Sequence, residues 1–161
     1  MEDYRHKIKA LTEAKQEIDH LKSMGKKVVF TNGCFDILHV GHARYLYKAR
    51  TLGDYLIVAV NSDRSVRGIK GPERPVVNQD ERAEMVAALE FVDTVIIFDR
   101  DTPFEVIKYL MPDMLVKGGD WKPEDIVGSD IVIAAGGEVR SIDFVEGHST
   151  SRLIEKIEGG S

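Results

Sequence analysis

Short apolar runs alternate along the chain with segments of helical periodicity, and this alternation constrains the fold more than any other feature. The run Tyr55–Val60 is almost wholly apolar, as expected for a strand in a parallel sheet that is covered on both faces. The runs that predict strands lie at 27–31, 55–60, 95–98, 114–116 and 139–144. Strands that alternate with helices form βαβ units, so we predict an α/β fold with a doubly wound parallel sheet.

The intervening segments predict helices. At the N-terminus, apolar residues at helical spacing predict one helix over 4–24 that ends at Gly25. Further helices are predicted over 41–52, 79–91, 102–110 and 129–135, with a last one after Gly147 that runs to Ile157. The polar segment 61–78 is interpreted as a long loop because it contains two glycines and two prolines: Gly68, Gly71, Pro72 and Pro75.

Two of these helices carry more detailed predictions. In 79–91, the side chains of Met85, Ala88 and Leu89 are expected to share the buried face. In 102–110, Thr102 is expected to cap the helix, with Pro103 in its first position and Glu105 completing a capping box.

Length and composition bound the class of protein. The 161 residues predict one domain, with an N-terminal helix within 1–25 and a frayed tail at 159–161. A net charge of −5 argues against general nucleic-acid binding. The chain shows neither a secretory signal nor the roughly 18 apolar residues of a membrane span. Its one cysteine, Cys34, fits a reducing cytoplasm, and we favour a packed role for it over a catalytic thiol.

Residues 31–42, TNGCFDILHVGH, carry the strongest functional signal. His39 and His42 lie where the first predicted strand gives way to a helix, a junction whose backbone N–H groups and helix dipole favour anions. Gly41 has no Cβ, so a ligand can approach the backbone closely. The pattern indicates a site for a nucleoside triphosphate. A metal site and two ordinary surface histidines are the alternatives.

The string also resembles the signature of the nucleotidyltransferase superfamily, G-x-F-D-x-x-H-x-G-H. Each position of that signature is matched, by Gly33, Phe35, Asp36, His39, Gly41 and His42. The resemblance implies a Rossmann-like nucleotidyltransferase fold. In such sheets, ligands bind beyond the carboxyl ends of the strands, so the segments 31–42, 61–74, 117–121 and 146–152 are expected to converge there.

Three further segments have both a functional and a purely structural interpretation. The loop 61–74 carries four cations that could clamp a phosphate as a mobile lid, or could be a solvated surface: Arg64, Arg67, Lys70 and Arg74. The segment 117–121, KGGDW, is either a ligand-binding turn or a simple turn with a packed Trp121. Hydroxyl side chains at 149–151 either cap the last helix or bind phosphate, and the segment resembles the second superfamily signature.

The similarity extends to roughly residues 5–157 and to a narrower family, the D-glycero-β-D-manno-heptose 1-phosphate adenylyltransferases. This resemblance implies transfer of AMP from ATP to heptose 1-phosphate, giving ADP-heptose and pyrophosphate for lipopolysaccharide core or surface-glycan synthesis. It further implies Mg²⁺ carried with ATP, a cytoplasmic enzyme, and a homodimer. In many bacteria the unit is fused to a sugar kinase, so this chain resembles the stand-alone form.

The resemblance also implies the roles of individual residues. We expect His39, His42 and Arg152 to be catalytic, and Asp36 to be at most an indirect partner of the Mg²⁺. Phosphate contacts are expected from Lys70, Arg82 and Arg152, although a helix arginine such as Arg82 is usually a surface charge. The full set of expected nucleotide contacts is Thr31, Asn32, Gly33, Cys34, Phe35, Asp36, His39, Gly41, His42, Asn61, Lys70, Arg82, Lys117, Asp120, Ser149, Thr150 and Arg152.

Two departures from related patterns affect the substrate. Glycerol-phosphate cytidylyltransferases carry Arg-Thr where this chain has Phe144–Val145, which argues for ATP over CTP. Trp121 stands where the fused heptose enzymes commonly carry Tyr. The alternatives are therefore a cytidylyltransferase for an alcohol phosphate such as glycerol 3-phosphate, and a nucleotide sensor without turnover. The roles of Trp121 and His148 are not assigned by the sequence.

Overall fold

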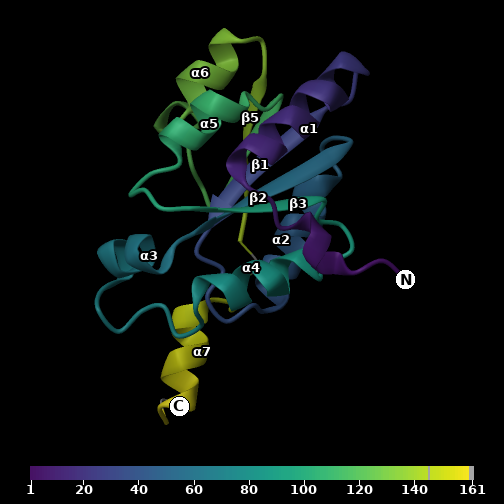
Figure 1. Cartoon of the computed structure of the whole chain (residues 1–161). Coiled ribbons are helices and arrows are strands. Elements are labelled where there is room, and N and C mark those ends of the chain that lie inside the picture. The colour runs from purple at the N-terminus through teal and green to yellow at the C-terminus, as the bar shows by residue number, and fades with distance from the viewer. Residues whose placement is uncertain (145, 160–161) are drawn as a thin grey trace.

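The computed structural model describes residues 1–144 and 146–159, which form a five-stranded sheet with helices on both faces (Figure 1). All neighbouring strands are parallel, in the order β3-β2-β1-β4-β5. The strands are β1 (Val28–Gly33), β2 (Tyr55–Asn61), β3 (Thr94–Phe98), β4 (Met114–Gly118) and β5 (Glu138–Ile142). The predicted doubly wound parallel sheet is confirmed.

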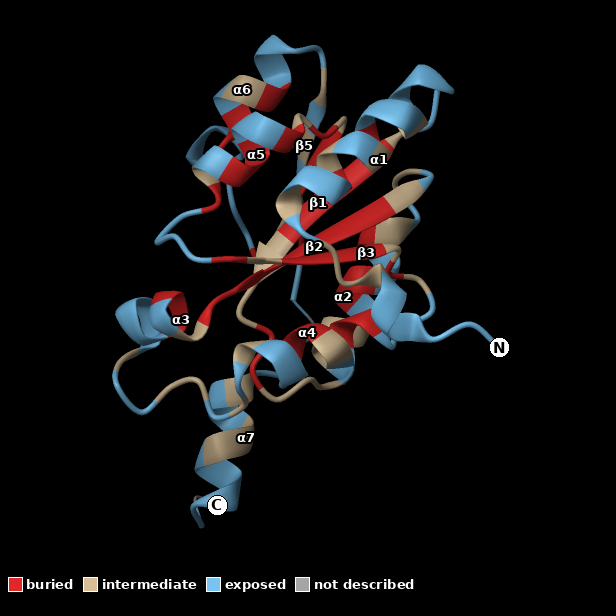
Figure 2. Cartoon of the chain, viewed as in Figure 1, coloured by how far each residue is buried: buried red, intermediate tan, exposed pale blue. Residues whose placement is uncertain are grey.

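Alternate residues of each strand supply two separate cores. Val29 packs with helices α2 (Val40–Arg50) and α4 (Gln79–Ala87) on one face of the sheet. Val28 and Phe30 pack with the helices of the other face, which are α1 (Leu11–Ser23), α5 (Phe104–Leu110) and α6 (Ser129–Ala134). Figure 2 shows the central strands almost entirely buried between these layers.

Carboxylates hold the end of the sheet at which the strands begin. Asp54 accepts the backbone N–H of Lys27 at 2.8 Å, and Asp93 accepts that of Leu56 at 2.7 Å. Asp113 accepts the N–H of Val28 at 2.9 Å. Because side-chain oxygens satisfy these backbone donors, this end of the sheet has a structural role. The opposite end, where the strands end, carries the loops that build the site.

The predicted helix over 4–24 is wrong, because two elements occupy this range. A 3-10 helix (Tyr4–Lys7) precedes α1. Between them, Ile8 forms a parallel bridge with Val95, and the N–H of Lys9 donates to the Val95 carbonyl at 2.9 Å. Pairing with the edge strand β3 thus takes the backbone that a continuous helix would need.

The predicted loop over 61–78 is also wrong in its first half, where α3 (Asp63–Lys70) forms. The Ser62 hydroxyl accepts the N–H of Ser65 at 3.1 Å, which caps the start of the helix. Gly71, with φ of 103°, ends it, so the glycine and proline signals that suggested a loop act after the helix.

The predicted face of the helix over 79–91 is wrong as well. In α4 the buried residues include Ala83, Val86 and Ala87, whereas Met85 is exposed. The helix also contains the buried Arg82. An apolar pattern does not predict that a charged residue such as Arg82 is buried.

The remaining boundaries differ in detail. Pro103 occupies the N-cap of α5 and makes no side-chain cap bond, so the predicted capping by Thr102 is wrong. A short 3-10 helix (Pro123–Asp125) precedes α6, and β5 ends two residues before 144. The last helix, α7 (Thr150–Ile157), is capped by Ser149 and projects from the body of the fold (Figure 1).

Val145 and residues 160–161, which include most of the predicted tail, lie outside the described residues. Within the part of the chain that the structure describes, no helix has the length and apolar character needed to cross a membrane.

Candidate active site

A cavity of about 590 Å³ opens beyond the carboxyl ends of the strands, near the point where strand order reverses between β1 and β4. Its walls come from the segments that follow β1, β4 and β5, together with the end of α3 and the loop after it. Twelve of the predicted contact residues line it: Asn32, Gly33, Cys34, Phe35, Asp36, His39, His42, Lys70, Lys117, Ser149, Thr150 and Arg152. Folding thus brings the four predicted segments together.

The two histidines are stacked at the start of α2. Their ring centroids lie 3.8 Å apart at an interplanar angle of 26°. His39 Nδ1 accepts the N–H of Gly41 at 3.1 Å, and His42 Nδ1 accepts the N–H of His39 at 3.3 Å. Since both Nδ1 atoms are acceptors, each neutral ring carries its proton on Nε2, the atom available as a donor to a ligand.

The surroundings keep these rings neutral before a ligand arrives. Burial, with a smaller effect of neighbouring His39, lowers the pKa of His42 to about 4. Burial also lowers the pKa of His39, and the nearby His148 adds to that effect. A polyanion in the cavity would favour the charged forms again, because opposite charge raises the pKa of a histidine.

Asp36 connects three segments of the site. Its side chain, 0% exposed, accepts from Arg74 Nε at 2.8 Å and from the backbone N–H groups of Val76 and Val77, each at 2.9 Å. Its backbone carbonyl accepts the hydroxyl of Thr150 at the start of α7. Both carboxylate oxygens are therefore engaged by the protein, so Asp36 ties the loop after β1 to residues 74–77, and its indirect role beside Mg²⁺ stays a prediction.

Arg82 is a buried structural residue, so both earlier interpretations of it are wrong. Its side chain is 1% exposed and does not line the cavity. The guanidinium donates to the carbonyls of Cys34, Asn61 and Val77 at 2.6–2.8 Å. It also pairs with Asp63 at 2.9 Å. Arg82 thus holds the loops after β1 and β2 and the loop before α4 in fixed positions.

Four other predicted contacts do not line the cavity. Thr31 is buried and shares a 2.6 Å hydrogen bond with the Tyr45 hydroxyl, and Asn61 donates to Ser65 at 2.9 Å. Asp120 is exposed outside the cavity. Gly41 lies against the histidine rings, and a Cβ there would come within 2.8 Å of His39 and 3.1 Å of the His148 side chain.

Several cavity residues were missed by the sequence reasoning. Tyr45 gave no signal beyond its place on an apolar helix face, whereas Arg74 belonged to a recognised cluster of cations. Phe144 and His148 stood inside recognised motifs without an assigned contact. Trp121 lies outside the lining and donates from Nε1 to the Gly118 carbonyl at 3.1 Å.

Cys34 lines the cavity, but its environment does not favour catalysis. Burial raises the pKa of its thiol. A thiol with a raised pKa is a poor nucleophile at neutral pH, which supports the packed role.

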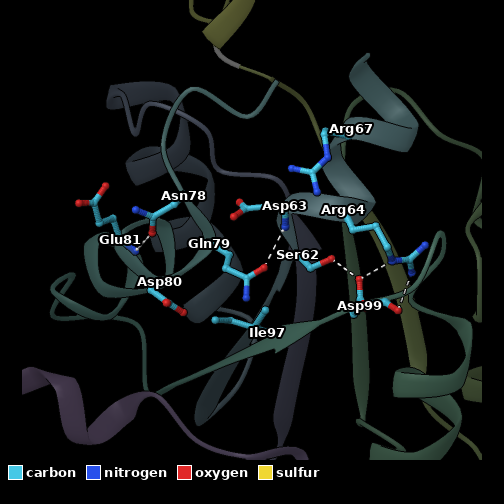
Figure 3. Close-up of a pocket in the computed structure, with 10 residues that line it drawn as sticks. All are labelled: Ser62, Asp63, Arg64, Arg67, Asn78, Gln79, Asp80, Glu81, Ile97 and Asp99. Atoms are coloured by element: carbon cyan, nitrogen blue, oxygen red, sulfur yellow. Dashed lines mark hydrogen bonds and ion pairs between the residues drawn. The ribbon is translucent and has the colours of Figure 1, made fainter. Parts of the chain in front are cut away.

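The cations of segment 61–74 are divided between two hollows. Lys70 and Arg74 line the main cavity, whereas Arg64 and Arg67 line a second one of about 620 Å³ (Figure 3). There Arg64 pairs with Asp99 at 2.8 Å. Four carboxylates share this second hollow, namely Asp63, Asp80, Glu81 and Asp99, so its charge is unsuited to a triphosphate. The predicted clamp therefore reduces to two residues.

Among residues 1–144 and 146–159, no group of three or more His, Cys, Asp or Glu side chains is placed to hold a metal ion.

The sequence matches the Cytidylyltransferase-like family over residues 30–155, which include all the segments that line the main cavity. The chain belongs to the Cytidylyltransferase-like family. In a solved member of the same fold, the lipopolysaccharide core biosynthesis protein from Thermoplasma volcanium, the similarity covers 77% of this chain and 100% of that one, with a TM-score of 0.61 and 25% identity.

Pantothenate synthetase from Thermus thermophilus shares the fold alone, at a TM-score of 0.56 and 15% identity over 86% of this chain and 62% of the other.

Sequence relatives of this cytidylyltransferase-like chain are considerably more similar. The bifunctional protein HldE from Citrifermentans bemidjiense is 56% identical over 96% of this chain and 32% of its own length. HldE from Photobacterium profundum is 54% identical over 99% of this chain and 33% of its own length. The chain thus spans about a third of the length of these relatives.

Proposed function

We propose that this chain transfers the adenylyl group of ATP to D-glycero-β-D-manno-heptose 1-phosphate, giving ADP-heptose and pyrophosphate. The observation that carries the proposal is the convergence of the stacked His39 and His42 with Lys70, Arg74 and Arg152 around one cavity. The heptose acceptor rests on the resemblance of the segments 31–42, 52–76, 115–129 and 146–154 to heptose 1-phosphate adenylyltransferases. The high identity to HldE proteins supports it.

The chemistry requires positioning and charge stabilisation rather than a protein nucleophile. An oxygen of the sugar phosphate attacks the α-phosphorus of ATP in line; the new P–O bond forms as the bond to the pyrophosphate oxygen breaks. We assign the Nε2–H groups of His39 and His42 to the phosphoryl oxygens on which charge grows. Lys70, Arg74 and Arg152 are assigned to the triphosphate, whose negative charge they match.

Enzymes of this family use a divalent metal together with a nucleoside triphosphate. We propose Mg²⁺, carried by the triphosphate and its waters, because Mg²⁺ commonly binds through substrate phosphates with few protein ligands. A cytoplasmic location and a homodimer complete the proposal, the second on the family resemblance and on the frequency of symmetric dimers.

The substrate pair is tested by pyrophosphate release with each combination of ATP or CTP and heptose 1-phosphate or glycerol 3-phosphate. We expect ATP to be preferred over CTP by at least about tenfold in kcat/KM, because a site built for one base leaves polar groups unpaired with another. Glycerol 3-phosphate should be a poor acceptor, since it cannot fill a heptose pocket. A preference for CTP with glycerol 3-phosphate would overturn the assignment, and binding of ATP without turnover would favour a nucleotide sensor.

A further inference from the structure

Phe144 is an aromatic side chain exposed in the wall of the main cavity. It is 68% exposed and lines the cavity just after β5 ends. A residue of this type normally buries its ring, since an aromatic side chain carries a large apolar area. Its exposure at a ligand cavity, rather than on an outer surface, indicates that something else covers it.

The backbone beside Phe144 is shaped to hold the ring. A Cβ on Gly118 would come within 2.7 Å of Phe144 Cε1, and one on Gly119 within 3.2 Å of Cε2. The ring therefore lies against two residues that leave room for it because they lack side chains. The turn itself is held by Trp121, whose Nε1 donates to the Gly118 carbonyl at 3.1 Å, and by the N–H of Gly119, which donates to the Ile142 carbonyl at 2.8 Å.

The lining of the cavity combines two kinds of surface. Its cations and imidazoles come from several segments, because Lys117 at the end of β4 and the residues His148 and Arg152 after β5 join those that follow β1 and β2. Its exposed aromatic surface is the ring of Phe144 after β5, whereas Phe35 and Tyr45 in the same lining are buried. A nucleoside triphosphate offers a partner for each kind of surface, with a polyanion at one end and a flat aromatic base at the other.

We propose that the exposed ring of Phe144, supported by Gly118 and Gly119, is the surface on which the nucleobase of the bound triphosphate stacks. The inference rests on the proposed function in one respect, that the cavity takes a nucleoside triphosphate, and it names Phe144 as the residue that holds the base. The alternative occupant is the sugar, whose C–H groups can also stack on an aromatic face, and the titration of ATP described below distinguishes the two. Stacking is tolerant of base identity, so Phe144 adds affinity for bases in general and most for the larger purines.

The test is calorimetric titration of ATP and of inorganic tripolyphosphate into the wild-type chain and its variants. Phe144→Ala should weaken the binding of ATP by about tenfold or more, which is the scale for losing one base–aromatic stack. The same variant should bind tripolyphosphate with an affinity within about twofold of the wild type. Phe144→Trp should keep the affinity for ATP. Phe144→Leu should lose much of that affinity, because leucine keeps the apolar area but has no π-face. The matched control is Tyr109→Ala, which removes an exposed aromatic ring on α5, away from the cavity.

Gly118→Ala provides a second variant, in which Phe144 itself is not substituted. The added methyl group must displace the ring of Phe144, so the binding of ATP should weaken while the binding of tripolyphosphate should not change. The proposal is overturned if Phe144→Ala binds ATP like the wild type, if it loses ATP and tripolyphosphate equally, or if Phe144→Leu binds ATP like the wild type.

Failure of this inference is distinguishable from failure of the proposed function. If the enzyme preferred CTP or a different acceptor, the four-pair turnover assay would show it, and Phe144→Ala would still weaken whichever nucleotide binds. If Phe144 does not hold the base, Phe144→Ala binds nucleotide normally and the turnover assay still identifies the substrates of the wild type.

Discussion

At the scale of single residues, His39 and His42 carry the most direct prediction. His39→Ala or His42→Ala should lower kcat by about 10²-fold or more, the scale for removing one preorganised donor. Because His39 also caps α2 through Gly41, His39→Asn is the matched variant that can keep a cap acceptor without the imidazole. Pyrophosphate release measures the effect, with circular dichroism as the control for folding. Near-normal turnover in the folded variants would remove the ring from the mechanism.

The low pKa of His42 predicts a pH dependence of stability. The folded ring titrates near 4 and the unfolded one near 6.5, so the unfolded chain binds more protons between these values. Stability is therefore full above about pH 6.5 and falls as the pH drops towards 4. After a discount for partial exposure, we expect about 1–2 kcal/mol from this residue. Urea unfolding from pH 7 to 4.5 should show a flatter profile for His42→Gln, and parallel profiles would contradict the prediction.

Arg82 predicts a structural effect rather than a loss of phosphate binding. Arg82→Lys replaces a planar group that contacts three carbonyls and Asp63 with a single ammonium, so several buried oxygens lose their donors. We expect a loss of about 3 kcal/mol in the free energy of unfolding, the scale for breaking a buried ion pair. Arg44→Lys, at an exposed position of α2, is the control. Equal unfolding midpoints for Arg82→Lys and wild type would contradict the role.

At the scale of elements, the segment 61–74 remains the predicted lid, and the contact of Arg74 with Asp36 holds its end to the loop after β1. Asp36→Asn replaces one acceptor oxygen with a donor, so it should release Arg74, Val76 and Val77 from the loop after β1. Tryptic cleavage after Lys70 should then be faster than in the wild type, because local opening governs proteolysis. Asp80→Asn, exposed on α4, is the control.

The same assay tests closure of the lid over the ligand. Saturating ATP, Mg²⁺ and sugar phosphate should slow the cleavage after Lys70 in the wild-type chain. An unchanged rate would show that this segment does not respond to the substrates.

At the scale of the whole molecule, the site draws on segments from residue 32 to residue 152, so a ligand should stabilise the entire fold. A ligand at 100 times its Kd adds about 2.7 kcal/mol, which for a domain of this size corresponds to a rise in Tm of roughly 5–10 °C. Differential scanning calorimetry with ATP and Mg²⁺ measures the shift. A Tm that does not depend on ATP concentration would contradict binding at this cavity.

The sequence by itself determined the sheet and the location of its functional edge. Apolar runs predicted the five strands because buried parallel strands need near-continuous apolar residues. The motif at 31–42 placed His39 and His42 at a strand–helix junction because its spacing is local and needs no distant partner. Four recognised segments followed strands, which was enough to predict where they would meet.

Tertiary structure alone decided what depended on distant partners. Pairing of Ile8 with Val95 broke the predicted N-terminal helix, because a strand edge offered its backbone a competing set of hydrogen bonds. Arg82 and Asp36 became structural residues because folding surrounded them with carbonyls and N–H groups from other segments. Local periodicity depends only on residues that are near in sequence, so it does not reveal such partners. A charged residue that binds a ligand and one that holds loops together therefore cannot be distinguished by this pattern.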